Sequence, residues 1–270
     1  MLTSNFSALG LSQCEADHAV FISRWSTPPD SSITMPMSGD HLVLMIPIHV
    51  DDSLAITNSV SLYAWFVREI STKVDFVCLG PVINTRYLSQ RIIRDCPSKT
   101  IHISQSDLIT ALLEDWCMME CKTSLVPLSH NLNNLSCPDI PDADLTLAYQ
   151  RLVGSLTYLA ICTHPDLAYA AMALGQYNAS PTRAHLVVAK GVLRYLAGTI
   201  HLGLTFSLLN HCLPDSVQLH TAACGLSDAD WASDERDRKS ISGYCFFFCN
   251  SLVSWSARKQ QMLDGLHLLY

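Results

Sequence analysis

The chain is poor in charged residues and has no long hydrophobic run. Charged side chains make up 15% of its 270 residues and hydrophobic ones 49%. That balance argues against global disorder and supports a buried core, in one large domain or two of ordinary size. The longest apolar runs, such as LVLMIPI, are far shorter than the ~20 residues that a membrane-spanning helix needs, so we expect no contact with a membrane.

Basic residues are scarcer than acidic ones. Lys and Arg number 17 against 24 Asp and Glu, which gives a net charge of −7. This is the wrong sign for a free-standing nucleic-acid-binding protein. The acidic excess lies in the N-terminal half: residues 1–150 carry −8, whereas residues 183–270 carry +1.

Features of secretion and of zinc binding are also missing. The first residues lack the basic and apolar regions of a signal peptide. The 11 cysteines include two C-x3-C pairs, at 117/121 and 245/249, without a His or Cys partner at zinc-finger spacing. We expect buried free thiols in a reducing compartment, and a chain that is intracellular, cytoplasmic or nuclear, and not secreted.

The apolar pattern predicts a mixed α and β chain without internal repeats. A helix over 2–9 and a strand at 18–23 are followed by two apolar arms of a β-hairpin, which turns at 49–52. Pro47 lies in the first arm. Because proline has no N–H for a sheet, it predicts an edge strand or a bulge there.

The rest of the chain alternates in the same way. The predicted elements are a helix at 61–71, strands at 75–84 and 99–104, a helix at 107–116, and a loop or linker at 123–147. Three helices with apolar stripes follow over 149–198; Thr163 is the predicted N-cap of the second, and Ser180 of the third, with Pro181 at its first position. Strands are predicted at 203–208, 219–231, 243–250 and 252–259.

Two motifs bring carboxylates together. In HVDD, Asp51 and Asp52 lie at the hairpin turn, where oxygen ligands could hold Mg²⁺ for phosphoryl transfer. An Asp-rich turn without metal is the more frequent case for this motif alone. In SDADW, strand alternation would turn Asp228 and Asp230 to one face and bury Trp231 on the other. Such a pair invites a cation, although a polar strand end fits the spacing equally well.

A basic group follows the second motif. It can neutralise phosphates or balance the acids around it, and the second reading is favoured because charge runs are usually solvated faces. The residues concerned are Arg236, Arg238 and Lys239 among Asp234, Glu235 and Asp237.

Seven stretches, in this order, resemble the Pol polyprotein of copia-type LTR retrotransposons, from the middle of reverse transcriptase into ribonuclease H. They are VDD at 50–52, LG at 79–80, IHISQ at 101–105, YQRLVGSLTYLAICTHPDLAYA at 149–170, AKGVLRYLAGTIHLGL at 189–204, SDADWASD at 227–234 and RKSISGYCFFF at 238–248. The resemblance implies an α+β fold: part of a reverse-transcriptase palm/thumb-like region at 1–122, a linker and helical connection at 123–204, and a truncated ribonuclease H-like sheet at 205–270.

The resemblance also implies a function. Proteins of this family copy RNA into DNA and degrade the RNA strand of the hybrid. By position, Asp51 and Asp52 resemble the palm carboxylates and Asp228 resembles the first nuclease carboxylate, all of them Mg²⁺ ligands. RNA template and RNA–DNA hybrid would be the partners, and the rest of the Pol polyprotein would be required.

The chain departs from the family pattern at several points. His49 stands where the family has Tyr, and Pro47 where it has an aliphatic residue. The strand with the third polymerase carboxylate would precede the chain, and the helix with a catalytic Glu would follow it; no Glu occurs after Glu235. We therefore expect both sites to be vestigial, Mg²⁺ binding to be weak or absent, and the chain to be inactive alone.

Three hypotheses remain open. The chain is a retrotransposon-derived fragment without activity; or it is a co-opted module that binds a protein or an RNA–DNA hybrid; or it is an enzyme half completed by neighbouring sequence. The net charge of −7 weighs against hybrid binding in the second.

Overall fold

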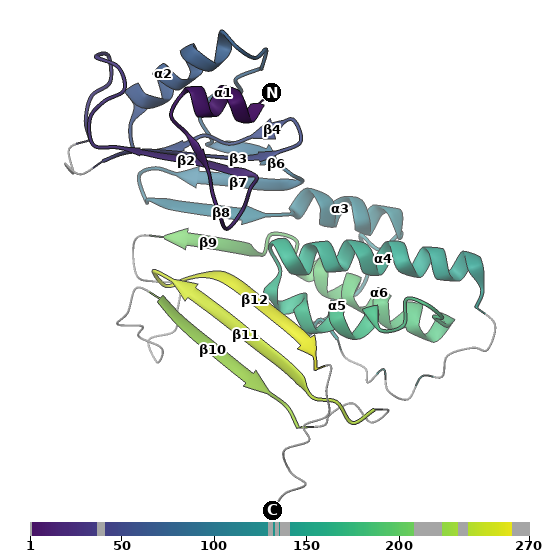
Figure 1. Ribbon diagram of the computed structural model, residues 1–270. Coiled ribbons are helices and arrows are strands. Elements are labelled where there is room, and N and C mark those ends of the chain that lie inside the picture. The colour runs from purple at the N-terminus through teal and green to yellow at the C-terminus, as the bar shows by residue number, and fades with distance from the viewer. Residues whose placement is uncertain are drawn as a thin grey trace, which may run out of the picture. The chain divides into compact units, whose positions relative to one another are not determined.

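The structure is a computed structural model that describes residues 2–36, 41–128, 132, 135, 141–207, 223–231 and 237–260. The chain divides into two compact units, unit 1 (Met1–Pro81) and unit 2 (Val82–Tyr270). Most of their elements are labelled in Figure 1. Helices and antiparallel sheets occur in both, so the α+β class is confirmed. The three predicted regions, with boundaries at 122 and 204, stay a prediction.

Unit 1 is a five-stranded antiparallel sheet with two helices. The sheet has the order β1-β2-β3-β4, and β5 also pairs with β3. The elements are α1 (Leu2–Ala8), β1 (Ser12–Gln13), β2 (Val20–Trp25), β3 (Leu42–His49), β4 (Asp52–Ser53), β5 (Ile56–Thr57) and α2 (Val60–Ser71). The predicted helices, strand and hairpin are confirmed, although the second hairpin arm is split into β4 and β5.

Alternation along β3 explains how unit 1 is packed. Leu42, Leu44 and Ile46 are buried, and all three lie on one face because strand side chains alternate. Both helices lie on the same side of the sheet (Figure 1), and Phe6 of α1 and Phe66 of α2 share a core with these residues. The sheet is therefore held from one face by α1 and α2.

Pro47 does not lie on an edge strand, because β3 pairs with β2 on one side and with β4 and β5 on the other. The neighbouring arm is interrupted beside it. Leu54, between β4 and β5, donates its N–H to the Pro47 carbonyl (3.2 Å), outside the paired residues of those strands. The missing N–H of the proline is therefore accommodated by an irregularity in the sheet.

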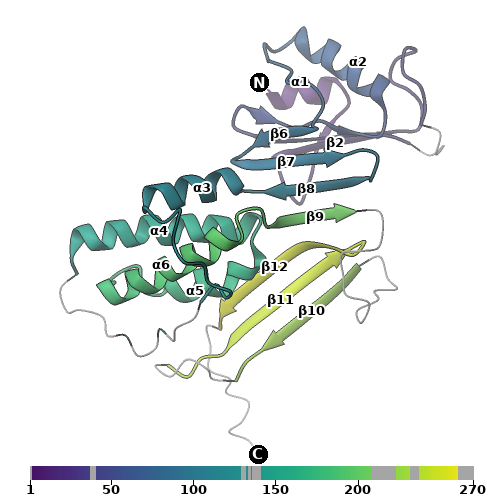
Figure 2. The same ribbon diagram turned by 180° about the vertical axis from the view of Figure 1, so that it is seen from behind.

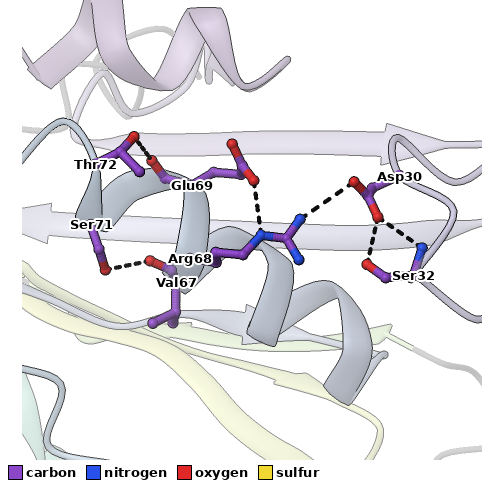
Figure 3. Close-up of polar contacts among 7 residues, drawn as sticks. All are labelled: Asp30, Ser32, Val67, Arg68, Glu69, Ser71 and Thr72. Carbon is purple, nitrogen blue, oxygen red and sulfur yellow. Dashed lines mark hydrogen bonds and ion pairs between the residues drawn. The ribbon is translucent and has the colours of Figure 1, made fainter.

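Arg68 of α2 forms an ion pair with the loop that follows β2. Its guanidinium contacts the carboxylates of Asp30 (3.4 Å) and Glu69 (3.0 Å), as shown in Figure 3. Asp30 also accepts hydrogen bonds from the hydroxyl and the N–H of Ser32. These two bonds, and to a lesser degree the charge of Arg68, hold the pKa of Asp30 below its usual value.

Unit 2 contains two antiparallel sheets and a group of helices. The sheet orders are β6-β7-β8-β9 and β10-β11-β12. The elements are β6 (Asn84–Tyr87), β7 (Gln90–Asp95), β8 (Thr100–Ser104), α3 (Ser106–Asp115), α4 (Ala143–Cys162), the 3-10 helix η1 (Pro165–Leu167), α5 (Ala168–Gly175), α6 (Arg183–Gly198), β9 (Gly203–Ser207), β10 (Ala223–Ala229), β11 (Ile241–Phe248) and β12 (Ser251–Lys259).

The helices α3 to α6 gather in both views and supply one core (Figures 1 and 2). The apolar stripes predicted for the three helices over 149–198 are buried, except that Leu186 is half-buried. Tyr149 of α4 is fully buried, and its hydroxyl donates to the Leu174 carbonyl (2.8 Å), so its polar atom is satisfied inside the core. Trp255 of β12 donates from Nε1 to the Ala160 carbonyl (2.6 Å), which ties the second sheet to α4.

The strand predicted at 75–84 is wrong over most of its length. No strand forms at 74–80, and Val77 and Leu79 are each 82% exposed. The hairpin of β6 and β7 was not predicted. Its turn residues Leu88 and Ser89 both have positive φ (50° and 58°), the conformation of a type I′ turn. Neither Gly nor Asn marks that turn in the sequence, so the usual signal is missing.

Two predicted N-caps are wrong. Thr182 caps α6 in place of Ser180: its hydroxyl accepts the His185 N–H (3.4 Å), and His185 Nδ1 accepts the Thr182 N–H (3.0 Å). This capping box carries His where Glu or Gln is usual, which hid it in the sequence. Thr163 is the C-cap of α4, not the start of the next helix.

The predicted linker at 123–147 also ends too late. Asp142 is the N-cap of α4, and its carboxylate accepts the N–H groups of Asp144 and Leu145 (3.1 Å each). Asp is a preferred N-cap, and the residues after Asp142 already have helical apolar spacing, so the sequence contained a signal for the start of this helix.

The expectation of buried thiols is wrong for the described cysteines. All nine are free, but none is buried: four are exposed and the rest are half-buried. Exposure therefore does not distinguish the two C-x3-C pairs from the other cysteines.

Candidate functional site

The Asp51–Asp52 pair lies at the tip of the β3–β4 hairpin. His49 pairs with Asp52, so Val50 and Asp51 form a two-residue loop. Val50 has φ of 56°, and Asp51 is not among the residues with positive φ. Positive φ at the first loop residue alone is the pattern of a type II′ turn. A β-branched residue in this region is strained, so β3 and its partners must hold the turn in place.

Both carboxylates of this pair are exposed, and so is His49 beside them. Asp51 belongs to the loop and Asp52 to β4, so consecutive carboxylates project from a turn fixed by the sheet. Carboxylate oxygens are the donors that Mg²⁺ prefers, and the pair could supply two ligands while water supplies the others. The donor set fits this ion; the role of the pair as ligands stays a prediction.

Asp228 and Asp230 differ in what they do. Asp228 is an exposed residue of β10, opposite Gly243 of β11, and its Oδ1 accepts the N–H of Ala229 (2.8 Å). Asp230 lies beyond the strand and bonds Ile241 twice: its N–H donates to the Ile241 carbonyl (3.0 Å), and its Oδ1 accepts the Ile241 N–H (2.6 Å). Asp230 therefore closes the β10–β11 hairpin, whereas Asp228 is the better candidate ligand.

Trp231 is 73% exposed, so the prediction that it is buried is wrong. That prediction extended strand alternation through the whole motif. β10 ends at Ala229, and alternation carries no information beyond the end of a strand.

The basic group after this motif is described only in part. Arg236, Asp234 and Glu235 lie outside the described residues. Lys239 and Lys259 both contact Asp237 (4.0 and 2.9 Å), which agrees with charge balance for Lys239. Sequence reasoning missed Lys259, which comes from β12 and is distant in the chain.

Across the residues that the structure describes, no group of three His, Cys, Asp or Glu side chains lies close enough to hold one metal ion. Asp51 and Asp52 belong to unit 1, and Asp228 belongs to unit 2. Within the same residues, no helix combines the length and the hydrophobicity that crossing a membrane requires.

A buried polar cluster at the CTHPD stretch was also missed. The Thr163 hydroxyl donates to Gln105 Oε1 (2.8 Å) and contacts His164 Nδ1 (2.9 Å). Burial lowers the pKa of His164, while the charge of Asp166 acts in the opposite direction. Burial, with Asp166 beside it, raises the pKa of Tyr195 on α6 to about 12. The cluster joins α3, α4, η1 and α6, and the adjacent Thr-His was its only signal.

Comparison with known proteins identifies the relatives of the chain. No family model and no solved structure match it. It is 29% identical over 240 residues to the retrovirus-related Pol polyprotein from transposon TNT 1-94 of Nicotiana tabacum. The matched residues make up 87% of this chain and 17% of that protein. It is 32% identical over 234 residues to the retrovirus-related Pol polyprotein from transposon RE1 of Arabidopsis thaliana. These residues make up 86% of this chain and 15% of that protein.

A third relative is similar in length. An uncharacterized mitochondrial protein of Arabidopsis thaliana is 32% identical over 214 residues, which are 79% of this chain and 82% of that protein. The chain thus spans less than a fifth of the Pol polyproteins that it matches. On this identity and coverage, the chain belongs to the retrovirus-related Pol polyproteins of copia-type transposons, and it corresponds to a fragment of them.

Proposed function

We propose that this retrotransposon-derived fragment carries part of a reverse-transcriptase palm in unit 1 and part of a ribonuclease H sheet in the C-terminal strands of unit 2. One observation carries the proposal: in this relative of Pol polyproteins, Asp51 and Asp52 are exposed at a hairpin turn. The strand that leads into the turn, β3, is central in its sheet and buried on one face. Asp228 on the exposed face of β10 is the corresponding residue of the nuclease part.

The chemistry would be phosphoryl transfer. Mg²⁺, when bound, would stabilise charge on the attacking and leaving oxygens. Asp51 and Asp52 would hold the ion at the polymerase site and Asp228 at the nuclease site. RNA template and RNA–DNA hybrid are the proposed substrates. Because phosphoryl transfer depends on positioning, the strain at Val50 would serve to aim the two carboxylates.

We further propose that the fragment has no catalytic activity alone. Two carboxylates at the β3–β4 turn, and one on β10, supply fewer ligands than a pair of metal ions requires. The chain matches 17% of the tobacco Pol polyprotein, so other Pol segments are the proposed source of the rest. The proposed location is intracellular, where element RNA is copied.

Primer extension on an RNA template with Mg²⁺ tests this proposal. The purified chain should give no extension and no cleavage of a labelled hybrid. The matched control is the Asp51→Asn, Asp52→Asn variant, which reports any contaminating polymerase. Extension by the wild type that disappears in this variant would show a complete polymerase site and contradict the proposal of inactivity.

A further inference from the structure

One face of α6 carries cations that form no ion pair within 4.0 Å among the described residues. Arg183, Lys190 and Arg194 are seven and four residues apart, so at 3.6 residues per turn they lie within about 40° of one another. The buried residues of α6 occupy the opposite face; they are His185, Ala189, Val192, Leu193 and Leu196. The helix is thus apolar toward the core, and its solvent face carries these cations, with the exposed Val187 between Arg183 and Lys190.

A segment at 122–124 lies against this basic face and forms a groove with it. Arg194 donates from Nε to the Lys122 carbonyl (2.7 Å), and Ser124 donates its N–H to the Arg194 carbonyl (3.1 Å). Gly198 permits the approach, because a Cβ at that position would lie 3.3 Å from Cβ of Thr123. The resulting hollow of about 400 Å³ is lined by Thr123, Ser124, Val187, Val188, Lys190, Gly191 and Arg194, so apolar side chains lie beside the two cations.

The cations of this groove are held in position. The bond from Nε to Lys122 fixes the Arg194 guanidinium and leaves up to four N–H donors for a ligand. Lys190 Nζ lies 4.8 Å from the centre of the Trp116 ring, a cation–π contact that keeps the ammonium on this face. Thr123 adds a hydroxyl, and no carboxylate lines this hollow.

We propose that the α6 groove binds the sugar–phosphate backbone of a nucleic acid, with Lys190 and Arg194 contacting phosphates. The inference rests on the proposed function, which makes an RNA–DNA hybrid the expected partner. From Arg183 to Arg194 the cations span roughly 16 Å at 1.5 Å per residue. That length exceeds a single phosphate group, so the row suits a continuous polyanion better than a small anion.

The two ends of the row are not equivalent. The adjoining hollow is lined by Arg183 and Lys190 but also by Asp142 and Asp144. These carboxylates repel phosphate, so the contacts concentrate at the end formed by Lys190 and Arg194. Removing one of the acids should therefore strengthen binding.

Fluorescence anisotropy of the full chain with a labelled RNA–DNA hybrid, in 50 to 200 mM KCl, tests the proposal. Two phosphate contacts predict a salt slope near −1.8 and about a 12-fold loss of affinity over this range. The Lys190→Gln, Arg194→Gln variant loses both contacts and should bring the slope close to zero. The matched control is Arg24→Gln, Lys73→Gln, which removes equal charge from exposed residues of unit 1 and should keep the slope.

Further variants separate charge from folding. Lys190→Arg and Arg194→Lys keep the charges and should keep the slope, whereas Asp144→Asn should raise the affinity. An unchanged slope in the double Gln variant, or an equal loss in the control pair, would overturn the proposal. So would competition by polyglutamate as strong as that by the hybrid, which would indicate an acidic protein partner. None of these outcomes bears on catalysis, which the Asp51→Asn, Asp52→Asn assay tests separately.

Discussion

The start of α6 allows a direct comparison of two caps. Thr182→Ala removes the hydroxyl that accepts the His185 N–H, and Ser180→Ala removes the hydroxyl at the position that the sequence favoured. Loss of an N-cap costs about 1 kcal/mol. Unit 2 spans residues 82–270, a size at which ~1 kcal/mol lowers the melting temperature by roughly 2–4 °C. We expect this decrease for Thr182→Ala, together with faster amide exchange in α6, whereas Ser180→Ala should leave α6 exchange unchanged.

His185, the second residue of the capping box, should have a larger effect on stability when it is replaced. His185 is fully buried, and its ring lies 4.1 Å from that of Tyr177, centre to centre. His185→Ala removes the acceptor of the Thr182 N–H and leaves a cavity, so a loss of about 3 kcal/mol is expected, as for other buried rings. His185→Gln restores the usual capping-box acceptor and should lose less.

Circular dichroism at 222 nm during heating gives the melting temperatures. Hydrogen–deuterium exchange of peptides from residues 183–198 shows whether the loss is local to α6. If Thr182→Ala leaves α6 exchange unchanged, or if Ser180→Ala accelerates that exchange as much as Thr182→Ala does, the assigned cap is wrong.

Three further predictions concern the β3–β4 turn, Asp228 and the buried cluster. Val50→Gly should raise the melting temperature slightly, because relief of about 1–2 kcal/mol of strain exceeds the ~0.5–1 kcal/mol entropy cost of Gly; a decrease would show that Val50 is not strained. Asp228 should bind Mg²⁺ only weakly, so calorimetry should find no micromolar site that Asp228→Asn abolishes. The pKa of His164 is lowered by burial, so the unfolded chain takes up the proton first and stability should fall as the pH drops below about 6.5. His164→Gln should flatten that decline in melting temperature between pH 7 and 5; an equally steep decline would place the effect on other groups.

Burial periodicity made much of the fold predictable. The alternation of Leu42, Leu44 and Ile46 predicted β3, because apolar residues at every second position indicate a strand. The apolar stripes predicted α4 to α6, because their spacing fits the 3.6-residue turn of a helix. Prediction failed where backbone conformation rather than burial decides. The turn at Leu88 and Ser89 has positive φ without Gly or Asn, so nothing in the local sequence announces it.

The sequence was enough to identify the candidate carboxylates, but it was not enough to assign a role to each of them. The pairing of His49 with Asp52 follows from the hairpin pattern, and it places Asp51 in the loop. The spacing of Asp228 and Asp230 could not separate a ligand from a structural residue. That distinction came from the bonds between Asp230 and Ile241, a residue of another strand.

The net charge of −7 gave a reason to doubt hybrid binding, and the structure weakens that reason. Net charge describes the field far from a protein, whereas a phosphate in a groove responds to charges within about 8 Å at physiological salt. The acidic excess belongs to residues 1–150, and residues 183–270 are slightly basic. Within that part, Lys190 and Arg194 share a hollow that no carboxylate lines. A chain can therefore be acidic as a whole and still present one basic face to a nucleic acid. The salt slope of the Lys190→Gln, Arg194→Gln variant measures this local charge, because removing distant cations leaves the slope unchanged if the groove is the site of contact.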